Sequence, residues 1–174
     1  IHILPLPPLL VKNLKEEMKE ALYQSIEKVD AVLLSGGIDS SLVAKIEHDK
    51  NKDVKFISCG LKGSEDLVYS NILAEQVGAE IINVFLDEDN VLSSVKSLTD
   101  KFVSLAMSYN HDKNEKEVFD KNILRSIADE IGIDRRIVYR EKKAMQYGSG
   151  VVSILRSTSK TRGFKGINEL VNAL

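Results

Sequence analysis

The fold of this chain is decided by the stretch Ala31-Val32-Leu33-Leu34-Ser35-Gly36-Gly37-Ile38-Asp39-Ser40. Its first four residues are apolar and predict a buried strand, and the residues after the glycines predict a helix that begins near Asp39. Two glycines between a strand and a helix allow a tight bend that brings backbone N–H groups close to an anion. The stretch therefore predicts a phosphate-binding loop, in preference to an ordinary glycine-containing turn.

The side chains of this loop offer further groups for binding a phosphate. Ser35, Ser40 and Ser41 carry hydroxyl donors, and the helix adds its positive end and its unpaired amides. Asp39 carries a carboxylate suited to Mg²⁺, although the same charge would also compensate the helix N-terminus. Because no Walker lysine follows, the loop differs from the usual mononucleotide P-loop.

Length and composition indicate one globular domain that can bury a sizeable core. The chain has 174 residues, of which 43% are hydrophobic and 29% are charged. A net charge of −2 gives no overall attraction to nucleic acid or to an anionic membrane, so we expect neither as a partner. The single cysteine, Cys59, allows no internal disulfide and no cysteine cage for a metal, which fits the cytoplasm that we expect as the location.

Strands and helices alternate in the first half of the chain. Residues 1–10 are expected to form an extended arm, and apolar spacing predicts a helix over 11–28. Further strands and helices are expected over residues 30–34, 39–49, 54–60, 65–77 and 80–86. Alternation with continuous apolar strands predicts the α/β class: a doubly wound parallel sheet, with helices on both faces, over residues 11–108. Ligands of such sheets bind at the carboxyl ends of the strands, where the loop lies.

The second half is expected to be mostly helical. Helices are predicted over residues 89–108, 118–131, 151–159 and 167–174. Residues 137–139 and 151–152 favour a strand but are too short to assign, which leaves a sheet of three strands, smaller than usual. The third helix, over 65–77, is expected to begin after Ser64 as its N-cap and to close at Gly78.

The loop resembles the Ser-Gly-Gly-x-Asp-Ser signature of the ATP-pyrophosphatase (PP-loop) superfamily, whose fold is the adenine nucleotide alpha hydrolase-like, or HUP, type. Within it, the chain is similar to the synthetase domain of asparagine synthetase and its relatives. Four further segments carry this resemblance, in the family's order: Ile57-Ser58-Cys59-Gly60-Leu61, Gly63-Ser64-Glu65-Asp66-Leu67, Lys121-Asn122-Ile123-Leu124-Arg125 and the run from Arg140 to Gly150. The similarity covers residues 30–86 and 119–150.

The resemblance implies an ATP-dependent, amide-forming ligase that adenylates a carboxylate and releases AMP and pyrophosphate. It implies ATP and Mg²⁺ as cofactors, and Asp39 as the ligand of Mg²⁺. Asp39 and Lys121 are the expected catalytic residues, with Lys121 neutralising charge on the leaving pyrophosphate. The residues expected to bind the nucleotide are Leu34, Ser35, Gly36, Gly37, Ile38, Asp39, Ser40, Ser41, Cys59 and Gly60.

Several of these residues also have plainer interpretations. The side chain of Cys59 is interpreted as a small buried hydrophobe rather than a nucleophile, and Lys121 could equally be a solvated helix lysine. Other expectations are that Ser64 and Asp66 act as helix caps, that Arg125 pairs structurally, and that the basic run over 135–143 is a solvated face.

One departure from the family pattern falls between the third predicted helix and Lys121. The family carries a second loop there, Ser-Gly-Glu-Gly-x-Asp-Glu, whereas this chain has a polar stretch over 109–116. We expect residues 109–117 to form a loop or to mark a gap, residues 118–174 to form a helical C-terminal part, and residues 1–174 to be a single domain.

The sequence leaves two other functions open. One is a different PP-loop enzyme, acting on tRNA or a deazapurine, and the other is a non-catalytic nucleotide-binding module. For the ligase, the expected partners are ATP and a small carboxylate. The ammonia donor is not identified, since no glutaminase domain is present in this chain, and a homodimer stays open.

Overall fold

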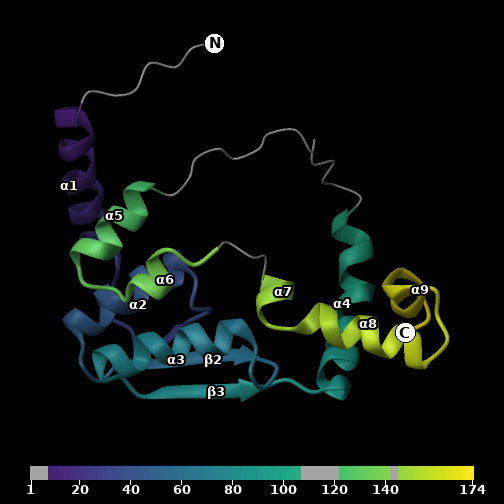
Figure 1. The fold of residues 1–174 in the computed structure, drawn as a ribbon. Coiled ribbons are helices and arrows are strands. Elements are labelled where there is room, and N and C mark those ends of the chain that lie inside the picture. The colour runs from purple at the N-terminus through teal and green to yellow at the C-terminus, as the bar shows by residue number, and fades with distance from the viewer. Residues whose placement is uncertain (1–7, 107–121, 142–144) are drawn as a thin grey trace, which may run out of the picture.

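The computed structural model describes residues 8–106, 122–141 and 145–174. Within these ranges three parallel strands are combined with helices (Figure 1). The elements are α1 (Pro8–Ser25), β1 (Ala31–Leu33), α2 (Ile38–Lys50), β2 (Lys55–Gly60), α3 (Glu65–Val77), β3 (Ile81–Phe85), α4 (Glu88–Ala106), α5 (Asn122–Glu130), α6 (Arg135–Val138), α7 (Met145–Gly148), α8 (Val151–Thr161) and α9 (Ile167–Asn172).

The sheet has the order β1-β2-β3, and each neighbouring pair is parallel. Leu33 is in register with Ile57, and Ile57 is in register with Ile82. The predicted α/β class with a parallel sheet and a mostly helical C-terminal part is confirmed. All three strands therefore end at the same edge, which holds the loop.

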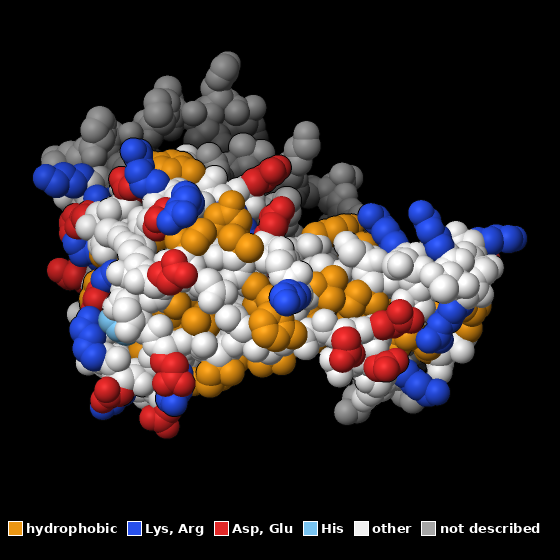
Figure 2. Space-filling model, turned by 60° about the horizontal axis from the view of Figure 1, so that its bottom comes forward, with side chains coloured by type: hydrophobic (Ala, Val, Ile, Leu, Met, Phe, Trp, Pro, Cys, Tyr) orange, Lys and Arg blue, Asp and Glu red, His pale blue; other side chains and the backbone are white. Residues whose placement is uncertain are grey.

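Among the described residues, helices cover the two faces of the sheet to different extents. Crossovers between parallel strands are right-handed as a rule, so two successive crossovers in the same direction place α2 and α3 on one face, where Phe56 and Ser58 are buried. The sequence leads us to expect helices on both faces, but among the described residues the other face keeps Leu33 78% exposed, with Ile82 and Val84 also exposed. Figure 2, with the bottom of Figure 1 turned forward, shows hydrophobic side chains reaching the surface in several places.

The described residues contain two hydrophobic clusters. The larger one lies between the sheet and helices α2, α3, α5 and α6, and includes Phe56, Leu73, Ile127 and Ile137. The smaller one joins α4, α8 and α9 through residues such as Val91, Leu155 and Leu170. Figure 1 shows these three helices beside the sheet and not above it. The site described below involves Leu34, Ile38 and Tyr69, which belong to the larger cluster.

Some helices begin where the sequence does not predict them. α1 starts at Pro8, inside the expected arm, because a proline at the first helical position loses no hydrogen bond there. The β-leaning residues 137–139 mostly fall in α6, whose N-cap Asp134 accepts a hydrogen bond from the Arg136 amide. In contrast, α3 has the predicted bounds, and Gly78 ends it in the left-handed conformation, with φ of 72°.

Candidate functional site

The loop after β1 is held by close contact with α3. Leu34 extends the strand by donating its amide to the Ile57 carbonyl at 2.8 Å. Gly36 then has φ of 66°, and a Cβ placed there would lie 2.5 Å from Tyr69 Cβ and 2.8 Å from the Ser70 amide nitrogen. Both the backbone conformation and the lack of space require glycine at this position.

Two hydroxyl groups line the turn of the loop. Ser35 Oγ and Ser40 Oγ are 3.0 Å apart, and Ser40 Oγ also donates to the Gly37 carbonyl at 3.1 Å. The Ser35 amide lies 3.3 Å from Ser40 Oγ, to which it donates. Ser35 is exposed and Ser40 is half-buried, so solvent reaches the hydroxyl pair.

Helix α2 begins directly behind these hydroxyls. Its N-cap is Gly37, and no side chain caps its first amides. Asp39 lies in the first turn and is exposed, whereas Ile38 is buried. Ser41 is fully buried, and its Oγ has no hydrogen-bond partner within the described part of the chain. The helix therefore presents Ser40 and Asp39 to solvent beside the loop, while Ser41 lies in the interior.

The neighbouring strand end lies close to the loop. Leu34 is 2% exposed, and Gly60 is buried at the end of β2. A Cβ on Gly60 would lie 2.5 Å from Ser64 Oγ and 3.2 Å from the Ser149 carbonyl oxygen, so the turn over 148–150 covers this strand end. The Leu61 amide donates to the same Ser149 carbonyl at 2.9 Å.

Two expectations about side chains at this end of the sheet are wrong. Cys59 is exposed and not buried, because its strand position faces the side of the sheet that the described residues leave uncovered. Ser64 is the N-cap residue of α3, but its Oγ makes no capping hydrogen bond and is a buried atom without a partner in the described ranges.

An ion pair that the sequence did not reveal joins the loop to the second half of the chain. Arg140 Nη2 donates to Asp66 Oδ1 at 2.7 Å, and Arg140 Nη1 donates to the Ser35 carbonyl at 3.0 Å. Both side chains of the pair are more than nine-tenths buried. Asp66 is therefore no simple helix cap, and Arg140 does not belong to a solvated face. The only sequence signal was that both residues lie in segments shared with the family.

Arg125 supports the same region by hydrogen bonds to the backbone. It donates to the Val138 carbonyl, and its Nη2 donates to the Arg140 carbonyl at 3.4 Å. The expected structural role is present, but these two acceptors are carbonyls and not carboxylates.

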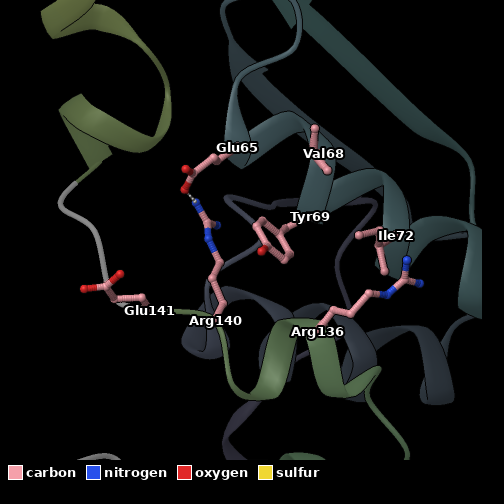
Figure 3. A pocket seen from close by; sticks show the side chains of 7 residues that line it. All are labelled: Glu65, Val68, Tyr69, Ile72, Arg136, Arg140 and Glu141. Atoms are coloured by element: carbon pink, nitrogen blue, oxygen red, sulfur yellow. Dashed lines mark ion pairs between the residues drawn. The ribbon is translucent and has the colours of Figure 1, made fainter.

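A pocket of about 510 Å³ lies beside the ion pair, between α3 and the segment that follows α6 (Figure 3). Tyr69 stands in its centre, and the Arg140 guanidinium lies 4.5 Å from the centre of the Tyr69 ring. Arg136, on the other side, pairs with Asp134 at 2.7 Å, which holds the pKa of Asp134 below its ordinary value. The pocket is lined by Glu65, Val68, Tyr69, Ile72, Arg136, Arg140 and Glu141.

The side chains at the loop fit Mg²⁺ only if phosphate oxygens of the substrate supply the remaining ligands. Within the described residues no three acidic, histidine or cysteine side chains cluster as metal ligands. Mg²⁺ in phosphate-transfer sites is commonly held by one or two carboxylates together with substrate phosphates. The exposed carboxylate of Asp39 beside the loop suits that arrangement.

Some predicted residues lie outside the described ranges. These are Lys121, the second expected catalytic residue, and the expected loop over 109–117. Among the helices that the structure does describe, none has the combination of length and apolar character that crossing a membrane requires.

Two solved structures resemble the chain in shape: the NMN synthetase from Francisella tularensis and an NH3-dependent NAD synthetase from Campylobacter jejuni. The first is 13% identical with a TM-score of 0.43, over 93% of this chain and 91% of that one. The second is 12% identical with a TM-score of 0.46, over 94% and 92%.

No curated protein matches the sequence. The model of the asparagine synthase family matches residues 14–100, which include the whole of the sheet and the loop. The chain therefore belongs to the asparagine synthase family of PP-loop ATP pyrophosphatases.

Proposed function

We propose that this protein is an ATP-dependent ligase that activates a small carboxylate by adenylation and then forms an amide. The observation that carries the proposal is the intact Ser-Gly-Gly-x-Asp-Ser loop between β1 and α2, inside the segment that matches the family. Gly36 supports it further, because the loop can pack against Tyr69 only if this residue has no side chain.

In the proposed reaction a carboxylate oxygen attacks the α-phosphorus of ATP. The bond from that phosphorus to the bridging oxygen breaks, and pyrophosphate leaves with the electron pair. Ammonia then attacks the acyl carbon and displaces AMP, and a proton passes to solvent as the amide forms. The chain's main contribution is to position the reactants and to stabilise negative charge that develops on the leaving group.

The loop residues take the pyrophosphate in this proposal. The hydroxyls of exposed Ser35 and half-buried Ser40, and the backbone amides at Gly36 and Gly37, donate to its oxygens. Ser41 is included among the proposed ligands, although its hydroxyl must turn from a buried position to reach a phosphate. Asp39 would hold Mg²⁺, and the bound ion would supply positive charge that stabilises the negative charge of the phosphates.

The adenine is proposed to lie between the adjoining strand ends. Leu34 and Ile38 provide buried apolar surface next to the loop, and the backbone at Cys59 and Gly60 flanks the base from β2. Lys121 completes the proposal as the cation that neutralises leaving pyrophosphate. We further propose that residues 1–174 act as one domain and that the protein works in the cytoplasm.

Isotope exchange tests the function directly. We expect label to pass from pyrophosphate into ATP only when a suitable carboxylate is present, and we expect AMP as the nucleotide product when ammonia is added. A panel of small amino-acid and dicarboxylate substrates would identify the acid. The Ser35→Ala variant, which removes an exposed hydroxyl, should slow exchange by about tenfold, as expected for one hydrogen bond to a charged group. ADP in place of AMP would overturn the proposal.

A further inference from the structure

Arg140 contacts parts of the chain that lie far apart in the sequence. One terminal nitrogen donates to the Ser35 carbonyl at 3.0 Å, and the other donates to Asp66 at 2.7 Å. Only 8% of the Arg140 side chain is exposed, and only 7% of the Asp66 side chain. Arg140 is thus anchored to protein oxygens in the interior, which is unlike a surface residue that waits for an anion.

Asp66 is also in close contact with the end of α7. A Cβ on Gly148, the last residue of this helix, would collide with the Asp66 carboxylate, so the helix end lies directly against it. The next residue, Ser149, accepts the Leu61 amide at 2.9 Å. The acidic partner of Arg140 therefore has a fixed position at the start of α3.

The same helix supports both the arginine and the glycine of the loop. Tyr69, one turn after Asp66, lies beneath the Arg140 guanidinium at 4.5 Å and also contacts the backbone at Gly36. Figure 3 shows Arg140 rising past Tyr69 toward Glu65, with which it forms a longer ion pair at 3.7 Å.

The hydrogen bond to Ser35 acts on a peptide unit that belongs to the loop. The carbonyl of Ser35 and the amide of Gly36 share one plane, and in a trans peptide they point in opposite directions. When Arg140 fixes the direction of the Ser35 carbonyl, it also fixes the Gly36 N–H, which points away from Arg140.

We propose that Arg140 is a positioning residue, which Asp66 holds in place and which aims the Gly36 amide at a pyrophosphate oxygen. This inference rests on the proposed function of the loop. It explains why a buried charge pair is placed behind an exposed anion site: preorganised donors need no reorganisation when the anion binds. It also requires arginine at position 140, because lysine cannot donate to two separate oxygens with the geometry of a planar fork.

The experiment compares two ligands on three variants of the full chain. Arg140→Lys keeps a cation for Asp66, Asp66→Asn keeps the size of the acid but removes its charge, and Arg136→Lys is the matched control. Arg136 lies in α6, a few residues before Arg140, and bonds Asp134 at the surface. Calorimetry measures the affinity for pyrophosphate with Mg²⁺, equilibrium dialysis measures the affinity for adenosine, and urea unfolding confirms that each variant is folded.

We expect Arg140→Lys to weaken pyrophosphate binding by about tenfold, which is the loss of one charge-assisted hydrogen bond behind the loop. Adenosine, which carries no phosphate, should bind as it does to the wild type. Asp66→Asn should weaken pyrophosphate binding in the same sense, and Arg136→Lys should change neither affinity.

Two results would overturn the inference. One is unchanged pyrophosphate affinity in a folded Arg140→Lys variant, and the other is equal weakening for pyrophosphate and adenosine, which a merely structural role would give. If Arg140→Lys does not fold, Asp66→Asn decides by the same criteria. A wild-type chain that binds pyrophosphate but catalyses no exchange would refute the proposed ligase and leave the positioning test intact, whereas one that binds no pyrophosphate would refute both.

Discussion

At each end of the sheet, one of the covering helices carries a buried acidic side chain, and the two acidic side chains have different partners. At the carboxyl end, Asp66 of α3 pairs with Arg140, which also reaches the loop. At the amino end, Glu47 of α2 is fully buried and accepts the Val29 amide at 3.0 Å. Burial of an acid therefore does not mark a functional site, because its partner decides what the acid can influence.

At the amino end of the sheet, two side chains hydrogen-bond to the backbone of Val29 and hold it in place. Glu47 accepts the amide of Val29, and Asn51 donates to the carbonyl of the same residue at 3.1 Å. Glu47 Oε2 has no hydrogen-bond partner among the described residues. This end fixes where β1 begins, so changes there should alter stability and leave the loop unaffected.

The largest expected difference between the ends involves two glycines with positive φ. Gly36→Ala should lower the free energy of unfolding by at least about 2 kcal/mol, because it adds a close contact with Tyr69 to an unfavourable backbone conformation. Gly78→Ala at the amino end has φ of 72° but no neighbour within 4 Å, so it should cost only about 1 kcal/mol. Urea unfolding measures both, and equal costs would show that the contact with α3 contributes nothing.

A smaller effect is expected from Glu47→Ala. The change leaves the Val29 amide without its acceptor, which should lower the unfolding free energy by about 1–3 kcal/mol. Pyrophosphate affinity, measured by calorimetry, should match the wild type, since Glu47 contacts β1 at its start and not at the loop. A loss of affinity comparable with that of Arg140→Lys would contradict the separation of the two ends.

The smallest effect concerns pH at the amino end. Burial, and next the charge of Lys52, lower the pKa of His48 below its ordinary value. The unfolded chain therefore binds this proton more readily, and the stabilising contribution of neutral His48 should be lost as the pH falls below about 6.5. Urea unfolding at pH 7.5 and 5.5 should show a steeper loss for the wild type than for His48→Gln. Equal losses would assign the pH dependence to other groups.

Local sequence patterns predicted the parts of the fold that depend on local physics. The strand–loop–helix unit around Gly36 and the closure of α3 at Gly78 follow from apolar runs and glycine conformations that neighbouring residues determine. Sequence patterns could not predict the exposure of Cys59, or that the described helices cover only one face of the sheet, because both depend on strand order and crossover direction.

The pairing of Asp66 with Arg140 could not be predicted from local sequence patterns either, because it also depends on the tertiary structure. A charge run over 135–143 is usually solvated, and Arg135 and Arg136 are indeed exposed. Arg140 differs because the chain after α6 turns it toward Tyr69 and the loop, which only the tertiary structure determines. The roles assigned to the loop residues in binding ATP stay predictions that the experiments above address.

The hydrogen bond from Arg140 to Ser35 also constrains the order in which parts of the protein fold. It joins residues 105 positions apart, and the ion pair with Asp66 spans 74 positions. Closing such long chain segments carries an entropic cost that neighbouring contacts do not share, so these links form late. During synthesis the glycine turn leaves the ribosome before residue 140 does, so the bond that fixes the Ser35 carbonyl cannot form until residue 140 has emerged.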